Sequence, residues 1–367
     1  MRLVVCVLLA GLLTTSLGWE GGGRNWAWTH RAESAGLYPV DTATLEEEMR
    51  WLEASQTRQG ALAQNPEQRD VVPYFANLAA MALVQSNPEL VRHYLDWYLQ
   101  RLNRPDRFGL SGTIYDYGLG EGGRETPTFN YDSADSYAAT FLSLAASYVR
   151  AVGDLQWAKQ QQDKLQDVAE VVVRLQDSDG LVWAKPGTGI KLLMDNSEDY
   201  RGLTDWSWLL DQMGRPRVAA IYRERAEWIR RGIEKQLWNP WRGSYDWSLG
   251  GTRVPSLRPR WYPDTVAQLY PIVFGVIDPK SDRAQLLYAK VMAGFPRWAE
   301  GDTGDPFPWA ITAYAAVLVG DAGSAQVYLK HSAALWPPAT QRGPWYAAES
   351  GYLIRTVQLL GQIATKS

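Results

Sequence analysis

Two kinds of helical pattern alternate along this chain, and the alternation limits the fold more than any other feature. The odd-numbered segments are apolar on one face only, as in 155–176, where Leu165, Val168 and Val172 share a face. The even-numbered segments, such as 132–152, are apolar on most sides. Because a helix with a polar face lies at a surface and a helix without one lies inside, outer and inner helices should alternate.

Apolar spacing and stop signals predict about twelve helices. They span residues 42–55, 72–85, 88–103, 132–152, 155–176, 197–213, 216–237, 263–277, 280–297, 308–320, 322–335 and 345–362. No strand pattern interrupts them. Pro271 should kink or break the fourth inner helix near Tyr270, because proline lacks the N–H that a helix interior needs.

The connections alternate in length as well. Links from an inner to an outer segment are tight, as at 86–88 and 153–154. Links from an outer to an inner segment are long: 56–71, 104–131, 177–196, 238–262, 298–307 and 336–344. Long links in a compact domain are usually functional, and these all emerge where the inner helices begin. The sequence therefore predicts an all-α fold, an (α/α)6 barrel of six helical hairpins in a closed ring, with one elaborated face.

The N-terminal residues predict export. Arg2 supplies a positive charge, residues 3–13 form an apolar run, and residues 16–18 suit cleavage before Trp19. The expected organisation is a signal peptide at 1–18, an irregular arm at 19–41 and a single barrel domain at 42–367. The apolar run is too short to span a bilayer, so we expect a secreted or periplasmic protein without stable membrane insertion after cleavage.

Composition argues against several chemistries. The only cysteine, Cys6, lies in the apolar run, so the mature chain would have no thiolate, disulfide or cysteine-bound metal. His30, His93 and His331 lie in the arm and on outer helices, which argues against a zinc site or a histidine base. A net charge of -3 gives no basic field for nucleic acid, and no phosphate-binding loop is present. We expect no metal, no cofactor and no nucleic-acid partner.

Two segments resemble a known group of enzymes. Residues 131–136, Tyr-Asp-Ser-Ala-Asp-Ser, are similar to the segment that opens an inner helix in glucoamylase-like and debranching-enzyme-like members of the six-hairpin glycosidase superfamily. Residues 175–181, followed by 193–198, resemble the loop at the third hairpin of those enzymes. The resemblance is local by motif and covers nearly the whole mature chain by architecture. It implies an (α/α)6 barrel that acts on glycosidic bonds with paired carboxylates.

Glycoside hydrolysis needs a carboxylic acid that protonates the leaving oxygen and a carboxylate that acts as base or nucleophile. The resemblance gives the acid role to the start of the third inner helix, here Glu198 with Asp195 in reserve. It places the second carboxylate near Glu349 on the last inner helix, opposite in a ring of six. A helix dipole lowers the pKa of such groups, so the acid also needs an apolar pocket.

Asp132 and Asp135 open the second inner helix. Asp132 is expected to accept its first free N–H groups, with Asp135 at the capping-box position. A second carboxylate in a buried first turn also needs a polar partner, so Asp135 is expected to bind sugar hydroxyls or to act as the acid itself. Simpler alternatives exist for three of these acids. Asn196 and Asp199 would cap the third inner helix while Glu198 only favours its dipole, and Glu349 and Asp132 would each only cap a helix.

Aromatic residues are the remaining candidates. The chain has 18 Trp and 19 Tyr against 7 Phe, and Trp and Tyr combine a flat apolar face with a polar group that suits sugar rings. Helical cores use Trp too, which is the alternative. The expected substrate-binding residues are Asp132, Asp195, Tyr131, Trp183, Trp206, Trp247, Trp261, Trp309 and Trp345.

The function that these observations favour is an exported glycoside hydrolase that acts on an oligo- or polysaccharide. Two alternatives stay open. A non-catalytic carbohydrate-binding or scaffold protein would keep the ring and its aromatic residues without a working pair. A polysaccharide lyase would need Tyr and Arg beside a uronate in place of two carboxylates.

Overall fold

The computed structural model describes residues 42–250, 259–337 and 344–364. Residues Pro39–Ser367 form one compact unit. The expected signal peptide (1–18) and arm (19–41) lie outside the described residues.

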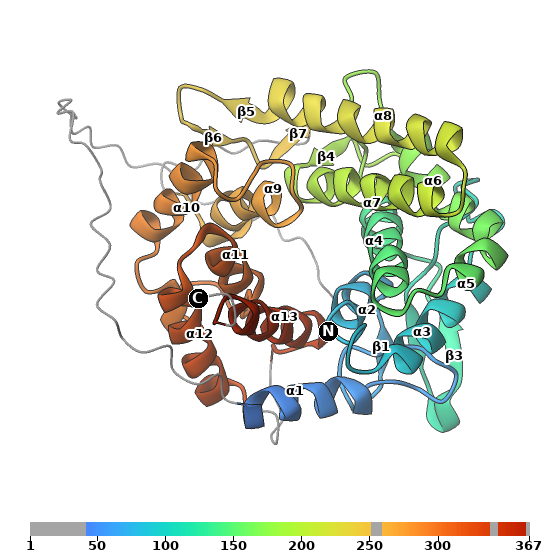
Figure 1. The fold of residues 1–367 in the computed structure, drawn as a ribbon, viewed down its shortest axis with the longest axis horizontal. Coiled ribbons are helices and arrows are strands. Elements are labelled where there is room, and N and C mark those ends of the chain that lie inside the picture. Colours follow the sequence, from blue (N-terminus) through green and yellow to red (C-terminus); the bar gives the residue numbers. More distant parts are fainter. Residues whose placement is uncertain (1–41, 251–258, 338–343, 365–367) are drawn as a thin grey trace. The chain divides into compact units, whose positions relative to one another are not determined.

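Six inner helices form a closed ring (Figure 1). They are α2 (Pro73–Ala80), α4 (Ala134–Val152), α7 (Leu193–Gln212), α9 (Tyr270–Val273), α11 (Ile311–Val319) and α13 (Ala347–Ala364). Each contacts the next in this order, and α13 contacts α2. Since α7 and α13 are three steps apart in either direction, they face each other across the ring.

The outer helices alternate with the inner ones along the chain (Figure 1). They are α1 (Thr42–Ala54), α3 (Pro88–Gln100), α5 (Leu155–Gln160) with α6 (Gln162–Leu175), α8 (Pro216–Gly232), α10 (Asp282–Gly294) and α12 (Ala322–Leu335). Helix α6 buries Leu165, Val168 and Val172, as its apolar face predicts. Helix α4 buries almost every residue of its first three turns. The all-α barrel fold is therefore confirmed.

Two contacts between inner helices depend on glycine. A Cβ at Gly202 of α7 would lie 2.6 Å from the Cα of Ala139 on α4. A Cβ at Gly351 of α13 would lie 2.7 Å from the Cα of Ala79 on α2. Only a residue without a side chain allows backbones to approach this closely. These contacts set the close spacing of α4 with α7 and of α2 with α13.

The fourth inner helix is broken, as Pro271 predicts. A π-helical turn at Trp261–Thr265 and a 3-10 turn at Val266–Leu269 precede α9, which begins at Tyr270 with Pro271 in its first turn. The proline has no N–H to donate to the preceding turn, so the regular hydrogen-bond pattern restarts there.

Contrary to expectation, the long links contain short strands. They are β1 (Asp70–Val71), β2 (Tyr117–Leu119), β3 (Glu125–Pro127), β4 (Ile190–Leu192), β5 (Trp238–Asn239), β6 (Ser244–Tyr245) and β7 (Ser248–Gly250). All pairings are antiparallel: β1 with β2, β2 with β3, β4 with β7, and β5 with β6. Strands of two or three residues are too short to show a period of two, which explains why the sequence pattern missed them. They join the first link to the second and the third to the fourth.

Two of these links have the same local structure, 120 residues apart. Gln56 and Gln176 each form an isolated bridge six residues on, with Leu62 and Val182. Each glutamine also donates to the carbonyl of a glycine four residues on, Gly60 or Gly180. The helices that follow, α2 and α7, begin at Pro73 and Leu193, which are again 120 residues apart.

Candidate active site at the mouth of the inner helices

The N-terminal ends of the inner helices, called the mouth here, collect buried carboxyl groups. Asp135 lies in the first turn of α4, and α7 contributes Asp195, Glu198 and Asp199 from its first two turns. All four are buried, with exposed fractions between 0% and 7%. Ser133 joins the two helices, because its Oγ lies 2.5 Å from Asp195 Oδ2 and 3.0 Å from Asp135 Oδ1.

The expected cap at α4 was wrong. The N-cap residue is Ser133, without a side-chain cap, and Asp132 is exposed. The Ala134 N–H donates to the Ala184 carbonyl at 2.7 Å, so the following link caps the helix in place of a side chain. Asp135 Oδ1 accepts from the N–H of the next residue, Ser136, at 2.7 Å.

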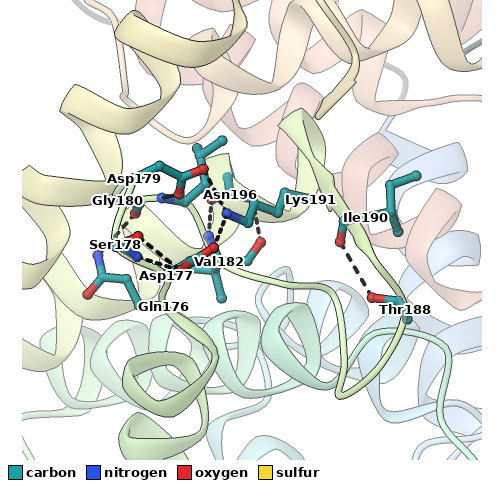
Figure 2. A network of polar contacts seen from close by, with 11 residues as sticks. Gln176, Asp177, Ser178, Asp179, Gly180, Val182, Thr188, Ile190, Lys191 and Asn196 are labelled. Carbon is teal, nitrogen blue, oxygen red and sulfur yellow. Dashed lines mark hydrogen bonds and ion pairs between the residues drawn. The ribbon is translucent and has the colours of Figure 1, made fainter. Parts of the chain in front are cut away.

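Helix α7 begins at Leu193, four residues before the expected start at 197. Asn196 therefore lies inside the helix. Its side chain accepts from Val182 N at 2.8 Å and donates to Val182 O at 3.1 Å and to Leu192 O at 2.9 Å. Asn196 thus fastens the third link to the start of α7 (Figure 2).

Lys191 completes this support (Figure 2). Its Nζ lies 2.7 Å from both Asp177 Oδ2 and Asp179 Oδ2 and 4.2 Å from the centre of the Trp183 ring. The lysine is 2% exposed. Asn196 and Lys191 hold the backbone from which Asp195 and Glu198 project, so the third link positions these acids.

Glu198 lies in an environment that favours its protonated form. The carboxyl is 1% exposed, and its Oε1 accepts a hydrogen bond of 2.7 Å from the hydroxyl of Tyr74 on α2. Burial raises the pKa of Glu198 well above its usual value, and the nearby Asp195 raises it further. The Glu198 carboxyl is therefore suited to donate a proton.

Glu349 projects from the first turn of α13, on the opposite side of the ring. Its Oε2 accepts from the N–H of Ala310, at the start of α11, at 2.5 Å. It therefore does cap a helix, but a neighbouring one. Burial raises the pKa of Glu349 to about 7, although the hydrogen bond from Ala310 lowers it. Near neutral pH, this group can accept a proton.

Two buried tyrosines lie close enough to these glutamates to feel their charge. Burial raises the pKa of Tyr352 on α13, and both Glu198 and Glu349 raise it further, so both carboxyls lie near this phenol. Tyr270 acts in the same way, since burial and the charge of Glu198 raise its pKa.

Asp195 and Asp116 are two further acids with a pKa near neutral pH. Burial raises the pKa of each to about 7. Asp116 Oδ1 accepts from the Tyr137 hydroxyl at 2.9 Å, and the Tyr137 ring stacks on Tyr74 at 6.1 Å. Sequence reasoning missed Tyr74 and Asp116, and it considered Asp199 only as a cap, whereas Asp199 lies inside α7. Tyr74 could have been found, because it follows the proline that opens an inner helix.

Among the aromatic residues predicted to bind substrate, Trp309 is the one that lies at the mouth. It has a positive φ of 57°, and strained backbone of this kind clusters at functional sites. Its Nε1 donates to Asp305 at 2.9 Å, and its ring stacks on Tyr262 at 5.2 Å. Tyr262 is 44% exposed, and burial of its hydroxyl end with the charges of Asp195 and Asp132 raises its pKa to about 12.

Other predicted substrate-binding residues lie elsewhere. Trp206 is fully buried against Tyr222 of α8, and Trp261 is buried against Phe295. Trp345 is buried, stacks on Trp336 and donates to Ser350. These three side chains pack between helices, which agrees with the alternative that helical cores also use tryptophan.

Three more support the links. The hydroxyl of the buried Tyr131 donates to Asp106 at 2.7 Å, and Trp183 covers Lys191. Trp247 is half-buried, and its carbonyl accepts from the Leu193 N–H at 2.9 Å. The structure thus brings Glu198, Asp195, Asp135, Glu349 and Trp309 to the mouth.

Across the described ranges, no group of three or more His, Cys, Asp or Glu side chains has an arrangement that could hold a metal ion. Nor is any helix in that part of the chain long and apolar enough to cross a membrane.

Solved structures with the same fold include several glycosidases. A wild-type glycosidase matches with a TM-score of 0.64 and 13% identity, covering 90% of this chain and 99% of the other. A variant glycosidase with a glutamate replaced by alanine, in complex with glucose, matches at 0.63 and 14%, with the same coverage. A rhamnosidase from Klebsiella oxytoca with rhamnose bound matches at 0.58 and 13%, covering 88% of this chain and 64% of the other. No protein-family model and no curated protein sequence matches the chain.

Proposed function

We propose that this protein is an exported glycoside hydrolase of the six-hairpin type, which cleaves a glycosidic bond of an oligo- or polysaccharide. The observation that carries the proposal is the pairing of two glutamates across the mouth in different environments. Burial and the nearby Asp195 raise the pKa of Glu198 well above its usual value, whereas burial raises the pKa of Glu349 to about 7. Two carboxyls whose surroundings push their pKa values apart are what acid and base roles require.

The roles follow from these two environments. Glu198 donates its proton to the leaving oxygen, and the Tyr74 hydroxyl holds the carboxylate that remains. Glu349, held by the Ala310 N–H, acts from the opposite side as base or nucleophile. Asp195 and the stacked pair of Trp309 and Tyr262 bind the sugar, with Asp132 at the exposed rim.

The solved neighbours support a sugar substrate. Among them are a glycosidase variant in complex with glucose and a rhamnosidase with rhamnose bound. Export to the periplasm or the medium is proposed from the leader sequence at 1–18. N-terminal peptide mapping of the protein recovered outside the cytosol should find a start near Trp19, whereas a cytosolic product that keeps Met1 would contradict export.

A substrate screen tests the activity directly. The purified protein is incubated with a panel of oligo- and polysaccharides that includes glucosides and rhamnosides, and new reducing ends are measured. Glu198→Gln and Glu349→Gln serve as matched controls for contaminating activity. Release of reducing ends by the wild type alone supports the proposal. Sugar binding without turnover would favour a carbohydrate-binding protein, and an unsaturated product would favour a lyase.

A further inference from the structure

Two buried carboxyls behind Asp195 have no part in the proposed acid and base pair. Asp135 on α4 and Asp199 on α7 are both 0% exposed. Their helices touch closely where Gly202 lies against Ala139. Asp199 precedes Gly202 by three residues and Asp135 precedes Ala139 by four. Since side chains lean toward the N-terminus of a helix, both carboxyls lie just beyond this contact.

The hydrogen bonds of the two carboxyls are incomplete. Asp135 Oδ1 accepts from Ser136 N at 2.7 Å and lies 3.0 Å from Ser133 Oγ. Asp135 Oδ2 and both oxygens of Asp199 have no hydrogen-bond partner within the described ranges. Two neighbouring ionised carboxylates with three such oxygens would suffer both desolvation and repulsion. One proton between them removes a charge and pairs two of the three oxygens.

We propose that Asp135 and Asp199 are a positioning pair that shares one proton, with Asp199 as the neutral donor and Asp135 as the ionised acceptor. The negative charge belongs on Asp135 because the Ser136 N–H and the start of α4 stabilise it there. Asp199 has no donor of this kind. Ser133 contacts both Asp135 and Asp195, so the pair fixes the orientation of Asp195 at the mouth.

The surrounding charges agree with this assignment. Burial, followed by the charge of Asp199, raises the pKa of Asp135 well above its usual value. Burial, followed by the charges of Asp195 and Glu198, does the same for Asp199. Helix α2 contributes the Tyr74 hydroxyl, which is bonded to Glu198. The neighbours of Asp199 are thus acidic, and they favour its neutral form.

The two asparagine variants test the assignment without any substrate. Asp199→Asn reproduces a neutral donor, whereas Asp135→Asn moves the charge to the site beside Asp195 and Glu198. Thermal unfolding is measured from pH 5 to pH 8 for the wild type, Asp199→Asn, Asp135→Asn and Asp199→Ala. Asp199→Asn should unfold within about 2 °C of the wild type at pH 5, and Asp135→Asn and Asp199→Ala at least about 3 °C lower.

The dependence on pH has a definite sign. A carboxyl with a raised folded-state pKa stabilises the fold at low pH, and this contribution falls as the pH rises above its unfolded value of about 4. Asp199→Asn lacks this proton, so it should gain about 2–4 °C on the wild type between pH 5 and pH 8. Infrared spectra should lose the carbonyl band of one protonated acid in the same variant.

Three outcomes would overturn the proposal. They are an Asp199→Asn protein with the pH slope of the wild type, an Asp135→Asn protein more stable than Asp199→Asn, and stabilisation by Mg²⁺ or Ca²⁺ that Asp199→Asn abolishes. The positioning role has its own readout. This role rests on the proposed function, whereas the shared proton does not. Asp199→Ala should lower kcat/KM about 10-fold to 100-fold, because Asp195 binds the sugar, and Asp199→Asn should restore it. An unchanged kcat/KM in Asp199→Ala, or no recovery in Asp199→Asn, would contradict positioning of Asp195, and the thermal test would still decide the shared proton.

Discussion

The first and third links give the same backbone two different chemistries. Residues 55–72 lead into α2, and residues 175–192 lead into α7, with the same turns, bridge and short strand at positions 120 apart. At the helix starts, Phe75, Leu78 and Ala79 of α2 correspond to Asp195, Glu198 and Asp199 of α7. Each link with its helix is called a copy here. The first copy, which ends in α2, therefore presents aromatic and apolar side chains, whereas the second copy, which ends in α7, presents the acid cluster.

The support beneath each helix differs in the same way. The third link contains the buried Lys191, bound to Asp177 and Asp179. At the matching positions the first link has Val71, Thr57 and Gln59. The lesson is that the loop geometry only aims a helix start at the mouth, and the side chains at that start decide what chemistry it carries. Tyr74 joins the copies, because it donates from α2 to Glu198 on α7.

The largest expected effect separates the acidic copy from the apolar one. Glu198→Gln and Glu349→Gln should each lower turnover by about 10²–10⁴-fold, because proton transfer is lost, while sugar binding and the melting temperature stay nearly unchanged. Leu78→Ala in the matching position of α2 should instead lower stability and leave the pH profile of turnover intact. Steady-state kinetics and thermal unfolding measure both. Normal turnover in either glutamine variant would remove that residue from the pair.

The shared loop backbone predicts equal effects in both copies. Gly60 has φ 98° and Gly180 has φ 92°, and a Cβ at either would lie 2.6 Å from a carbonyl oxygen of an outer helix, that of His93 or Trp228. Gly60→Ala and Gly180→Ala should each destabilise the fold by about 1–3 kcal/mol through strain and overpacking. Denaturant unfolding measures this. A harmless substitution in one copy alone would show that the loops differ in rigidity.

The contact between the copies gives a smaller effect. The Tyr74 hydroxyl lowers the pKa of Glu198, although burial raises it more. Tyr74→Phe should shift the basic limb of the rate profile to higher pH, because Glu198 keeps its proton longer, and should cost about 1 kcal/mol in stability. A pH–rate profile of kcat/KM tests the sign. A shift to lower pH would mean that another group is the acid.

The smallest effect concerns the charged support of the third link. The hydrogen bond from Lys191 lowers the pKa of Asp177, which is partly exposed. A lowered carboxyl pKa stabilises the fold above its unfolded value near pH 4, and this contribution is lost as the pH falls through the folded value. Lys191→Met should therefore cost about 1 kcal/mol or less after solvent screening, mostly above pH 4. Acid unfolding curves compare the variant with the wild type, and Val71→Met is the matched control in the first link. If Lys191→Met and Val71→Met had the same acid unfolding curve, Lys191 would not stabilise the third link through Asp177.

Much of the ring follows from the sequence by itself. Alternating apolar faces fix which helices lie inside, and alternating link lengths fix which end is elaborated, since both are local consequences of burial and chain connection. Pro271 also determines where the fourth inner helix restarts. The site was foreseen only in outline: the sequence and the family resemblance brought Glu198, Glu349, Asp195 and Asp135 forward because they stand at the starts of inner helices.

Only the tertiary structure decided what each side chain meets. Trp206 and Trp345 are of a residue type that can stack on a sugar ring, yet packing buries them between helices. The Ala184 carbonyl, fifty residues after Ala134, satisfies the N–H groups that Asp132 was expected to cap. The approach of Gly202 to Ala139 brings together the two helices that carry Asp199 and Asp135. Such contacts join residues that are far apart in the chain, so local sequence spacing does not predict them. The ring therefore follows from periodicity, whereas the protonation states at its mouth follow from which helices touch.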